Sequence, residues 1–578
     1  MKNFLPEMNF SISKRTLIFL SIIFLVGFLS YANTFKDSFH FDDFNYILEN
    51  NQIHQLNKLD RIWNFWPIRF IGVLTFALNY HFNQDQALGY HVVNFLIHII
   101  NGFLVFWLLV LLQDFQQKKQ NLKKDFSTHQ KTLLAFFGAL LFVSHPVQTE
   151  AVTYIFQRLA SLMTLFYFLS IALYLKAWQF NDRKKTVLLL FSWCFALMAM
   201  LTKENAFTLP FALVLIDGFF ISSFKEIKQK VIVLIPFGML LIIIPFLHLT
   251  SNSGVLHQEK FFYTPKQYYL TQIHVLWTYL RLLFLPIKQN LDYDYLLVKN
   301  LTLITVIKGI LLGGLLYLGI RLYSKNRMIS FGIIFFFLAH LVEILAFSIP
   351  NLICEYRCYL PILGFIMVAS GFWFQYLCRF PEFKKIYWVI FLLIPALTWA
   401  TYARNKTWIN EETLWKDVIK KSPYKPRGYQ NLGNVYAKQG QNELAFSNYE
   451  RALSLNSNNY YSYFGMGNIF ERKGELKKAK MAYEKAIQLK PNYVEALNNF
   501  GVVQMKIGEK QKALPPLKKA VKLKPYYLNG RINLGIAYAQ NQNYPKAMEE
   551  FQKALDIDPK RPNIHLNLAN LQEEMRKK

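Results

Sequence analysis

Two adjacent carboxylates, Asp42 and Asp43, stand in the stretch FHFDDFNYI, shortly after the first long apolar run of the chain. A carboxylate beside a hydroxyl nucleophile can take up its proton as a general base. Paired acids can instead hold a divalent metal ion together with phosphate oxygens. Capping of a short helix is the structural alternative. However, two acids flanked by Phe41 and Phe44 would still need partners, so the pattern favours a functional role.

Further acids and bases stand near the ends of later apolar runs, in the stretches PIRF, HPVQTEAVTYIFQR, LTKENAFTLP and CEYRCYLP. The candidate substrate-binding residues there are Arg69, Glu150, Arg158, Lys203, Glu204, Glu355 and Arg357. We expect Arg158, Lys203 and Arg357 to hold the charge of a lipid-phosphate leaving group. In the alternative, Arg158 and Lys203 are snorkelling helix ends, and Glu150 pairs with Arg158. Asp43 and Glu150 are the candidate ligands of a divalent metal, Mg²⁺ or Mn²⁺, if the reaction uses one; no other cofactor is indicated.

Eleven apolar runs are candidates to cross a bilayer core, which takes about 20 residues of helix. They lie near residues 16–32, 88–112, 132–147, 159–178, 186–202, 205–222, 231–249, 300–320, 329–349, 359–378 and 386–402. Lys and Arg fill the loops after the second, fourth, sixth and eighth runs, which marks the cytoplasmic side and places the N-terminus inside. Residues 266–285 are amphipathic, and counting them as a span would move every later basic loop outside. We therefore interpret them as an interfacial or partly buried helix on the outer side.

The composition fits a membrane part joined to a soluble part. Hydrophobic residues make up 53% of the chain and charged residues only 17%, which is too apolar for a disordered protein. The net charge of +29 does not predict nucleic-acid binding, because much of the basic charge marks membrane topology. The sequence has no glycine-rich phosphate loop or nucleotide-binding fingerprint.

Small residues recur every 34 positions in the last third of the chain. They are Gly433, Gly467, Gly501 and Gly535; Ala445, Ala479, Ala513 and Ala547; and Ala452, Ala486, Ala520 and Ala554. This period resembles the tetratricopeptide repeat (TPR), a pair of antiparallel helices. We predict an all-α fold, with a polytopic membrane domain over 1–403, a linker and partial TPR helix over 404–425, four repeats over 426–559 and a capping helix over 560–578. The concave face of such an α-solenoid suits an extended peptide.

Both halves together resemble a known group. The motifs FDDFNYI, PIRFIGVLTFALNY, LFVSHPVQTEAVTYIFQR, LTKENAFTLPFALVLIDGF and EYRCYLP, followed by the TPR tail, resemble the transmembrane-and-TPR-containing protein O-mannosyltransferases. An acid pair in the first outer loop also resembles the GT-C superfamily of glycosyltransferases. The resemblance implies inverting transfer from a polyprenyl-phosphate sugar, with Asp42 or Asp43 as the catalytic base and a slight preference for Asp42. It also implies that Glu150, Arg158, Lys203 and Glu204 line one cavity as substrate-binding candidates, and the EYR motif carries over onto Glu355 and Arg357.

The leading hypothesis is a multi-pass glycosyltransferase of a bacterial inner membrane. It would move mannose or another hexose from a polyprenyl phosphate to Ser or Thr hydroxyls of an extracytoplasmic protein, which the TPR domain binds on the same side. A close variant transfers the sugar to a lipid or polysaccharide. A non-enzymatic, membrane-anchored TPR scaffold for envelope assembly is the second class. A transporter is the third, but the charged residues cluster at loop ends rather than at mid-bilayer, where transport sites usually lie.

Overall fold

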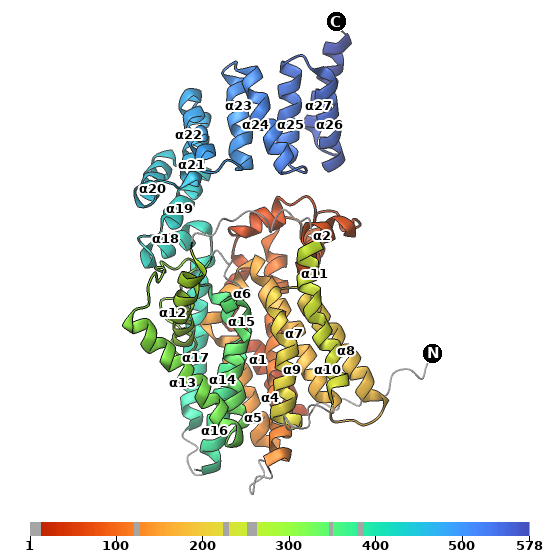
Figure 1. The fold of residues 1–578 in the computed structure, drawn as a ribbon, viewed down its shortest axis with the longest axis vertical. Helices are drawn as coiled ribbons and strands as arrows, with labels where there is room; N and C mark the ends of the chain where they lie inside the picture. The colour runs from red at the N-terminus through yellow and green to blue at the C-terminus, as the bar shows by residue number, and fades with distance from the viewer. Residues whose placement is uncertain are drawn as a thin grey trace. The chain divides into compact units, whose positions relative to one another are not determined.

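The computed structural model describes residues 13–120, 128–222, 230–250, 263–345, 351–379 and 386–576. Within these ranges the chain forms helices and turns and no β-strand. The all-α prediction is therefore confirmed for the described residues. The chain divides into two compact units, residues 1–413 and 414–578 (Figure 1).

The first unit is a bundle of helices of very different lengths. Its α-helices are α1 (Lys14–Tyr31), α2 (Leu59–Phe65), α3 (Phe70–Asn83), α4 (Ala87–Gln120), α5 (Thr128–Ser144), α6 (Thr149–Thr153), α7 (Arg158–Ala177), α8 (Arg183–Met200), α9 (Leu209–Ile216), α10 (Val231–Met239), α11 (Ile243–Thr250), α12 (Pro265–Phe284), α13 (Leu303–Arg321), α14 (Arg327–Ala339), α15 (Leu341–Leu345), α16 (Ile362–Arg379) and α17 (Ile386–Asn405). Short 3-10 and π turns join several of them, and the 3-10 turns carry four of the candidate site residues, Arg69, Glu204, Glu355 and Arg357.

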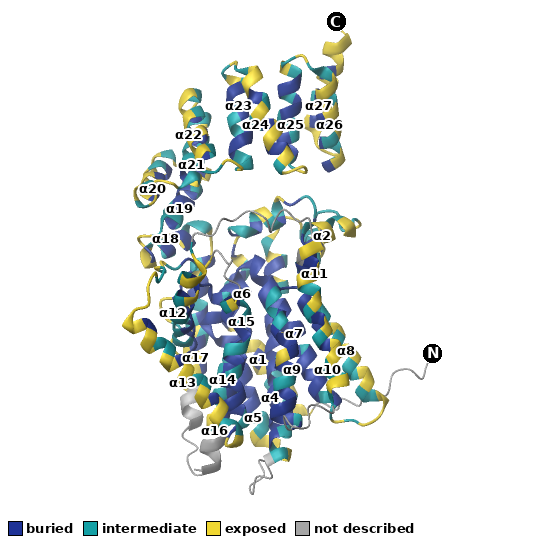
Figure 2. Ribbon diagram, viewed as in Figure 1, coloured by how far each residue is buried: buried dark blue, intermediate teal, exposed yellow. Residues whose placement is uncertain are grey.

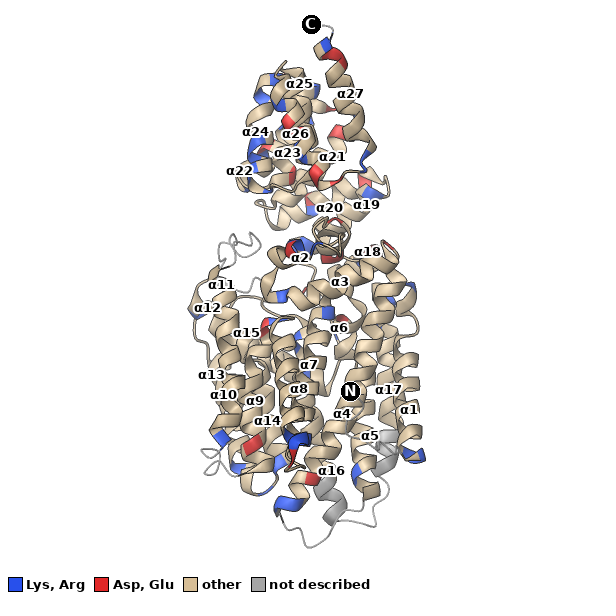
Figure 3. Ribbon diagram, turned by 90° about the vertical axis from the view of Figure 1, so that its right-hand side faces the viewer, with Lys and Arg blue, Asp and Glu red and all other residues tan. Residues whose placement is uncertain are grey.

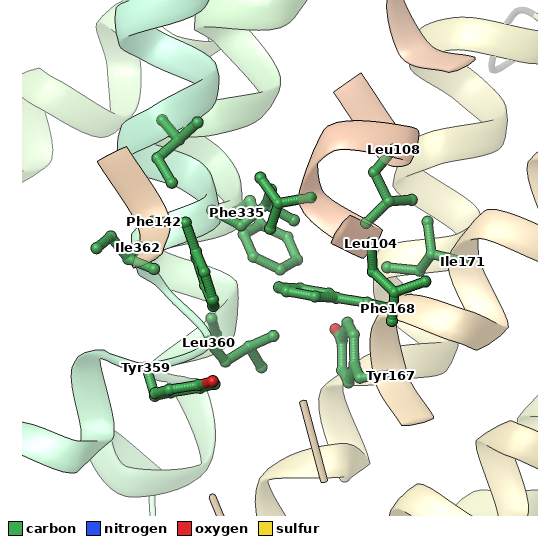
Figure 4. Packing of buried hydrophobic residues seen from close by; sticks show 14 of the residues in the cluster. Leu104, Leu108, Phe142, Tyr167, Phe168, Ile171, Phe335, Tyr359, Leu360 and Ile362 are labelled. Atoms are coloured by element: carbon green, nitrogen blue, oxygen red, sulfur yellow. The ribbon is translucent and has the colours of Figure 1, made fainter. Parts of the chain in front are cut away.

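The core of this unit lies between α4, α5, α7 and α14. Figure 4 shows Leu104, Phe142, Phe168 and Phe335 from these four helices pointing toward one another. All of them are buried, and together they form a dry aromatic and aliphatic interior. The elements that carry the site residues are thus fixed to a well-packed scaffold.

Apolar side chains also cover the outside of the unit. In the 18-residue apolar stretch of α13 only 17% of the residues are buried within the protein, and in that of α1 only 22% (Figure 2). Figure 3 shows the charged residues sparse along the middle of the helices and gathered near their ends. Long helices with exposed apolar surface and charged ends are typical of contact with lipid.

Fewer described helices are long and apolar enough to cross a membrane than the eleven that the sequence predicts. Five described helices meet both criteria, or six if α5 and the bent segment Pro146–Thr153 after it count as one span. Shorter apolar helices cover Val231–Leu247, Arg327–Ala339 and Ile362–Trp373. The predicted span 329–349 breaks in the structure, because α14 ends at Ala339 and a short α15 follows. The count of eleven therefore stays a prediction, as does the interfacial position of α12.

The second unit consists of helix hairpins. Its helices are α18 (Glu411–Lys421), which begins just before the boundary, α19 (Pro426–Lys438), α20 (Asn442–Leu455), α21 (Tyr460–Arg472), α22 (Leu476–Leu489), α23 (Val494–Lys506), α24 (Lys510–Leu523), α25 (Leu528–Gln540), α26 (Tyr544–Ile557) and α27 (Pro562–Arg576). The partners of each hairpin lie side by side in Figure 1. The periodic glycines lie where these helices cross. A Cβ atom built on Gly467 would lie 2.6 Å from the ring of Tyr483, and one on Gly433 would lie 2.7 Å from the ring of Tyr449. Small residues at this spacing are therefore required by close helix packing.

Replacing Gly467 with alanine is expected to destabilise the second repeat by about 1–3 kcal/mol, because the added methyl group overlaps the buried Tyr483 ring. Hydrogen exchange of α21 and α22 in the full-length chain would measure the loss of protection. The exposed substitution Ser447→Ala on α20 is the matched control. Unchanged protection in Gly467→Ala would contradict the packing argument.

Candidate active site

The acid pair lies in the segment that joins α1 to α2. Phe41 adopts a φ of 44°, a left-handed conformation that bulky residues rarely take. The chain therefore turns sharply just before the pair, and the two neighbouring carboxylates enter different environments. Asp43 is completely buried, whereas Asp42 is half-buried.

Asp43 is held by the backbone. Its Oδ2 accepts a hydrogen bond from the His40 N–H and its Oδ1 accepts one from the Phe156 N–H, both at 2.8 Å. Burial raises the pKa of Asp43 well above its usual value, although these donors and the charge of Arg158 act in the opposite direction. A buried carboxylate with both oxygens occupied is suited to anchoring the loop.

Asp42 contacts a buried tyrosine. Its backbone N–H donates to the hydroxyl oxygen of Tyr154 at 3.0 Å. Burial, and then the charge of Asp42, raise the pKa of Tyr154, so its hydroxyl stays protonated. Asp42 thus has a fixed position and partial access to solvent, which are the two properties that a general base needs.

The acids and the cation Lys203 meet around one short 3-10 turn, η5 (Ile155–Gln157). The tyrosine just before the turn contacts Asp42, and a backbone N–H within the turn contacts Asp43. Gln157, at the end of the turn, accepts a hydrogen bond from Lys203 Nζ at 3.4 Å. These partners are 112, 113 and 46 residues away along the chain. The fold therefore assembles carboxylates and a cation that the sequence places in three separate loops.

Lys203 is a buried amine with few partners. It is 7% exposed, and its Nζ lies 4.0 Å from the ring centroid of Tyr356. Burial, and then the neighbouring charge of Arg69, lower the pKa of Lys203 to about 7. An amine that titrates near neutrality gains a proton readily when an anion such as a phosphate approaches.

Arg69 stands beside this lysine and forms a bidentate ion pair with Glu204. Its Nε and Nη2 donate to the two carboxylate oxygens at 2.9 and 3.0 Å. The guanidinium also lies 4.2 Å from the Trp66 ring centroid. Nη1 donates to no residue that the structure describes, so Arg69 can still bind an additional acceptor.

Arg158 is completely buried, and its guanidinium is surrounded by protein acceptors. Nε donates to Asn94 Oδ1 at 2.6 Å, Nη2 donates to Asn79 Oδ1 at 2.7 Å and to the Tyr90 carbonyl at 3.1 Å, and Nη1 donates to the Thr75 carbonyl at 3.3 Å. These acceptors lie on α3 and α4, so Arg158 joins the start of α7 to both helices. The phosphate-binding role expected for Arg158 from the sequence is therefore not part of the function proposed below.

Glu355 and Glu150 connect separate segments of the first unit. Glu355 accepts a hydrogen bond from the Gln289 side chain at 2.8 Å. It also accepts hydrogen bonds from the Asn290 backbone N–H and from the Tyr293 hydroxyl, each at 2.6 Å. Glu150 accepts one from the backbone N–H that follows Glu355, at 3.0 Å. Among the described residues, no ion pair joins Glu150 to Arg158. Both glutamates thus hold neighbouring segments of the protein together by hydrogen bonds.

Arg357 lies close to Lys203 in a small hollow. Its guanidinium donates to the backbone carbonyls of Leu352 and Asn351 at 3.2 and 2.8 Å. Glu343, which the sequence analysis did not single out, lines the same hollow. The structure thus brings Lys203 and Arg357 together, as expected from the sequence, and adds a carboxylate.

The residues proposed for a metal do not fit one. In the parts of the chain that the structure describes, no group of three or more His, Cys, Asp or Glu side chains is arranged to hold a metal ion. Both oxygens of Asp43 are occupied by backbone N–H groups, and Glu150 binds a backbone N–H.

Two residues of the site, Tyr154 and Gln157, were not predicted from the sequence. Tyr154 and Gln157 lie within the quoted motif HPVQTEAVTYIFQR, but only its charged residues were singled out. An uncharged group at the start of a helix gives no sequence signal unless its distant partner is known. The recurrence of polar side chains in an otherwise apolar stretch was the one signal available.

Comparison with known proteins identifies relatives of both parts. The TPR repeat family matches residues 433–474, 467–508 and 537–575. A Caenorhabditis elegans protein named protein O-mannosyl-transferase F38B6.6 is 26% identical over 75% of this chain and 62% of its own length. The human protein O-mannosyl-transferase TMTC4 is 25% identical over 73% of this chain and 64% of its own, and human TMTC3 is 24% identical over 75% and 50%.

The chain thus spans less than two thirds of the length of these curated relatives. The matches nevertheless include most of the present chain, so they extend well beyond the repeats. They confirm the resemblance that the membrane motifs and the TPR period indicated: this chain is a relative of the proteins named protein O-mannosyl-transferases TMTC3 and TMTC4.

Proposed function

We propose that the protein is a membrane glycosyltransferase that moves a hexose from a polyprenyl-phosphate donor to Ser or Thr hydroxyls of an extracytoplasmic protein. The observation that carries this proposal is the turn η5, around which an accessible carboxylate and a poised lysine meet. The names of the relatives favour mannose as the sugar and a protein as the acceptor.

In the proposed reaction, Asp42 takes the proton of the acceptor hydroxyl as its oxygen attacks the anomeric carbon of the sugar. The new carbon–oxygen bond forms on one face while the bond to the phosphate breaks on the other, and the bonding electrons leave with the phosphate. Lys203 and the remaining donor of Arg69 bind the phosphate oxygens and stabilise this charge. Inversion at the anomeric carbon follows from attack opposite the leaving group, as expected for the GT-C class.

The proposal includes the topology derived from the basic loops. It places the N-terminus in the cytoplasm, the acid pair and the TPR unit outside it, and about eleven spans in a bacterial inner membrane. The donor lipid would enter sideways from the outer leaflet. The TPR unit would bind an extended segment of the acceptor protein.

Reconstitution of the full-length chain tests this function. We expect transfer of radiolabelled mannose from polyprenyl-phosphate mannose to a Ser/Thr-containing protein, with no requirement for a nucleotide sugar. Mass spectrometry of the product would identify the modified hydroxyl. Labelling of lipid or polysaccharide alone would indicate the other acceptor class. No transfer, together with a stable envelope complex isolated on the full-length chain, would favour the scaffold.

A further inference from the structure

A hollow beside Lys203 contains a buried carboxylate that the proposed mechanism does not use. It lies between α7, α15 and two 3-10 turns, η6 (Glu204–Thr208) and η12 (Glu355–Cys358). Its polar lining includes Lys203, Asn205 and Glu343, together with Arg357. Tyr359 and Leu360 complete it where it borders the apolar core, as Figure 4 shows for these two residues.

The two oxygens of Glu343 differ. Oε1 accepts a hydrogen bond from the Asn205 side-chain amide. Oε2 is buried, and no residue that the structure describes donates to it. Glu343 as a whole is only 5% exposed. A buried carboxylate oxygen without a donor destabilises a protein, so this oxygen points to a bound molecule that supplies the donor.

The charges around the hollow decide which ligand group fits. The vacant oxygen of Glu343 requires a hydrogen-bond donor, and its negative charge repels phosphate oxygens, which only accept. Among the described residues Lys203 donates one long hydrogen bond, so it can also serve a neutral acceptor. A hydroxyl group satisfies both, because it donates to a carboxylate and accepts from an ammonium.

We propose that Glu343, with Asn205 and Lys203, forms a subsite that binds one hydroxyl of the donor sugar and thereby selects among hexoses. This inference rests on the proposed function, because it places the sugar of the lipid donor beside the phosphate at Lys203 and Arg69. Lys203 then contacts both parts of the donor. Glu343 is a specificity-determining residue and takes no proton in the reaction.

The test compares polyprenyl-phosphate mannose with its four singly deoxygenated analogues, lacking the 2-, 3-, 4- or 6-hydroxyl. Wild-type protein should lose about 10- to 100-fold in kcat/KM on one analogue, because a hydrogen bond to a charged group is missing. Glu343→Ala should lose a similar factor on the complete sugar but at most about twofold more on that one analogue. Glu343→Gln keeps the shape of the side chain and the hydrogen bond from Asn205, so it is the second test variant if Glu343→Ala does not fold.

The matched control is Asp217→Asn. Asp217 is also completely buried, but its oxygens are bound by Tyr174, Ser222 and Lys230, and it lies at the far end of α9 from the hollow. This variant should keep the same ranking of donors as wild type. If Glu343→Ala and Glu343→Gln lower kcat/KM equally on all five donors, the hollow holds only water and the inference is overturned.

Equilibrium binding of the same donors to the solubilised full-length chain provides a readout that needs no turnover. If the wild-type protein discriminates between donors in binding and Glu343→Ala does not, the subsite stands even where transfer to protein fails. If transfer proceeds but every deoxygenated analogue binds as tightly as the complete donor, the result supports the proposed function and overturns the subsite. Absence of donor binding would overturn both.

Discussion

Asn in place of Asp42 is expected to lower kcat for sugar transfer by about 10²- to 10⁴-fold, the range that a positioned general base contributes. Folding and membrane insertion should be preserved, because residue 42 keeps the backbone N–H that donates to Tyr154, and the side-chain oxygen of asparagine can still accept from the Tyr154 hydroxyl as the carboxylate does. The measurement is single-turnover transfer from polyprenyl-phosphate mannose. Asp60→Asn, an exposed change on α2, is the control and should retain full activity.

Asp43→Asn should behave differently, although it alters the adjacent residue. Its side-chain amide would direct an N–H toward one of the two backbone donors that now bind the carboxylate, those of His40 and Phe156. We expect a loss of about 1–3 kcal/mol in stability, visible as a lower midpoint of thermal unfolding. If Asp42→Asn keeps most of the activity while Asp43→Asn is stable and inactive, the roles assigned to the two acids are reversed.

The repeat unit could be predicted in detail because its fold depends on local periodicity. Gly433 and Gly467 are 34 residues apart, and each packs against the aromatic ring 16 residues later in its own hairpin. Such contacts are short in sequence, so a pattern of small and aromatic residues reveals them. The membrane unit offered only the length and polarity of its runs. Length and polarity therefore do not predict that the run 329–349 breaks between α14 and α15.

The site was predictable in residue type but not in role. Lys203 and Arg158 are both cations near the ends of apolar runs, and the sequence alone does not distinguish their roles. The structure separates them by their partners: among the described residues, Arg158 binds four acceptors on α3 and α4, whereas Lys203 donates one long hydrogen bond. Glu343 could not be predicted as a site residue, because its partner Asn205 is 138 residues away along the chain. Partnership across such distances is determined by the packing of the whole unit.

Methionine in place of Arg158 is expected to destabilise the first unit by about 3–5 kcal/mol, because several buried acceptors are left without the guanidinium that donates to them. Two asparagine side chains and two carbonyls would lose their donor at once. Thermal unfolding and limited proteolysis of the solubilised full-length chain would measure the loss.

Lys203→Met provides the contrast, because it removes a buried cation that donates to one partner in the part of the chain that the structure describes. We expect it to change stability much less than Arg158→Met, and to raise the KM for polyprenyl-phosphate mannose, because the phosphate loses its cation. Arg158→Lys should restore little stability, since an ammonium cannot match the planar fork that reaches acceptors on two helices. If Arg158→Met is as stable as wild type and instead raises the donor KM, then Arg158 binds the phosphate after all, and the network on α3 and α4 is secondary to that role.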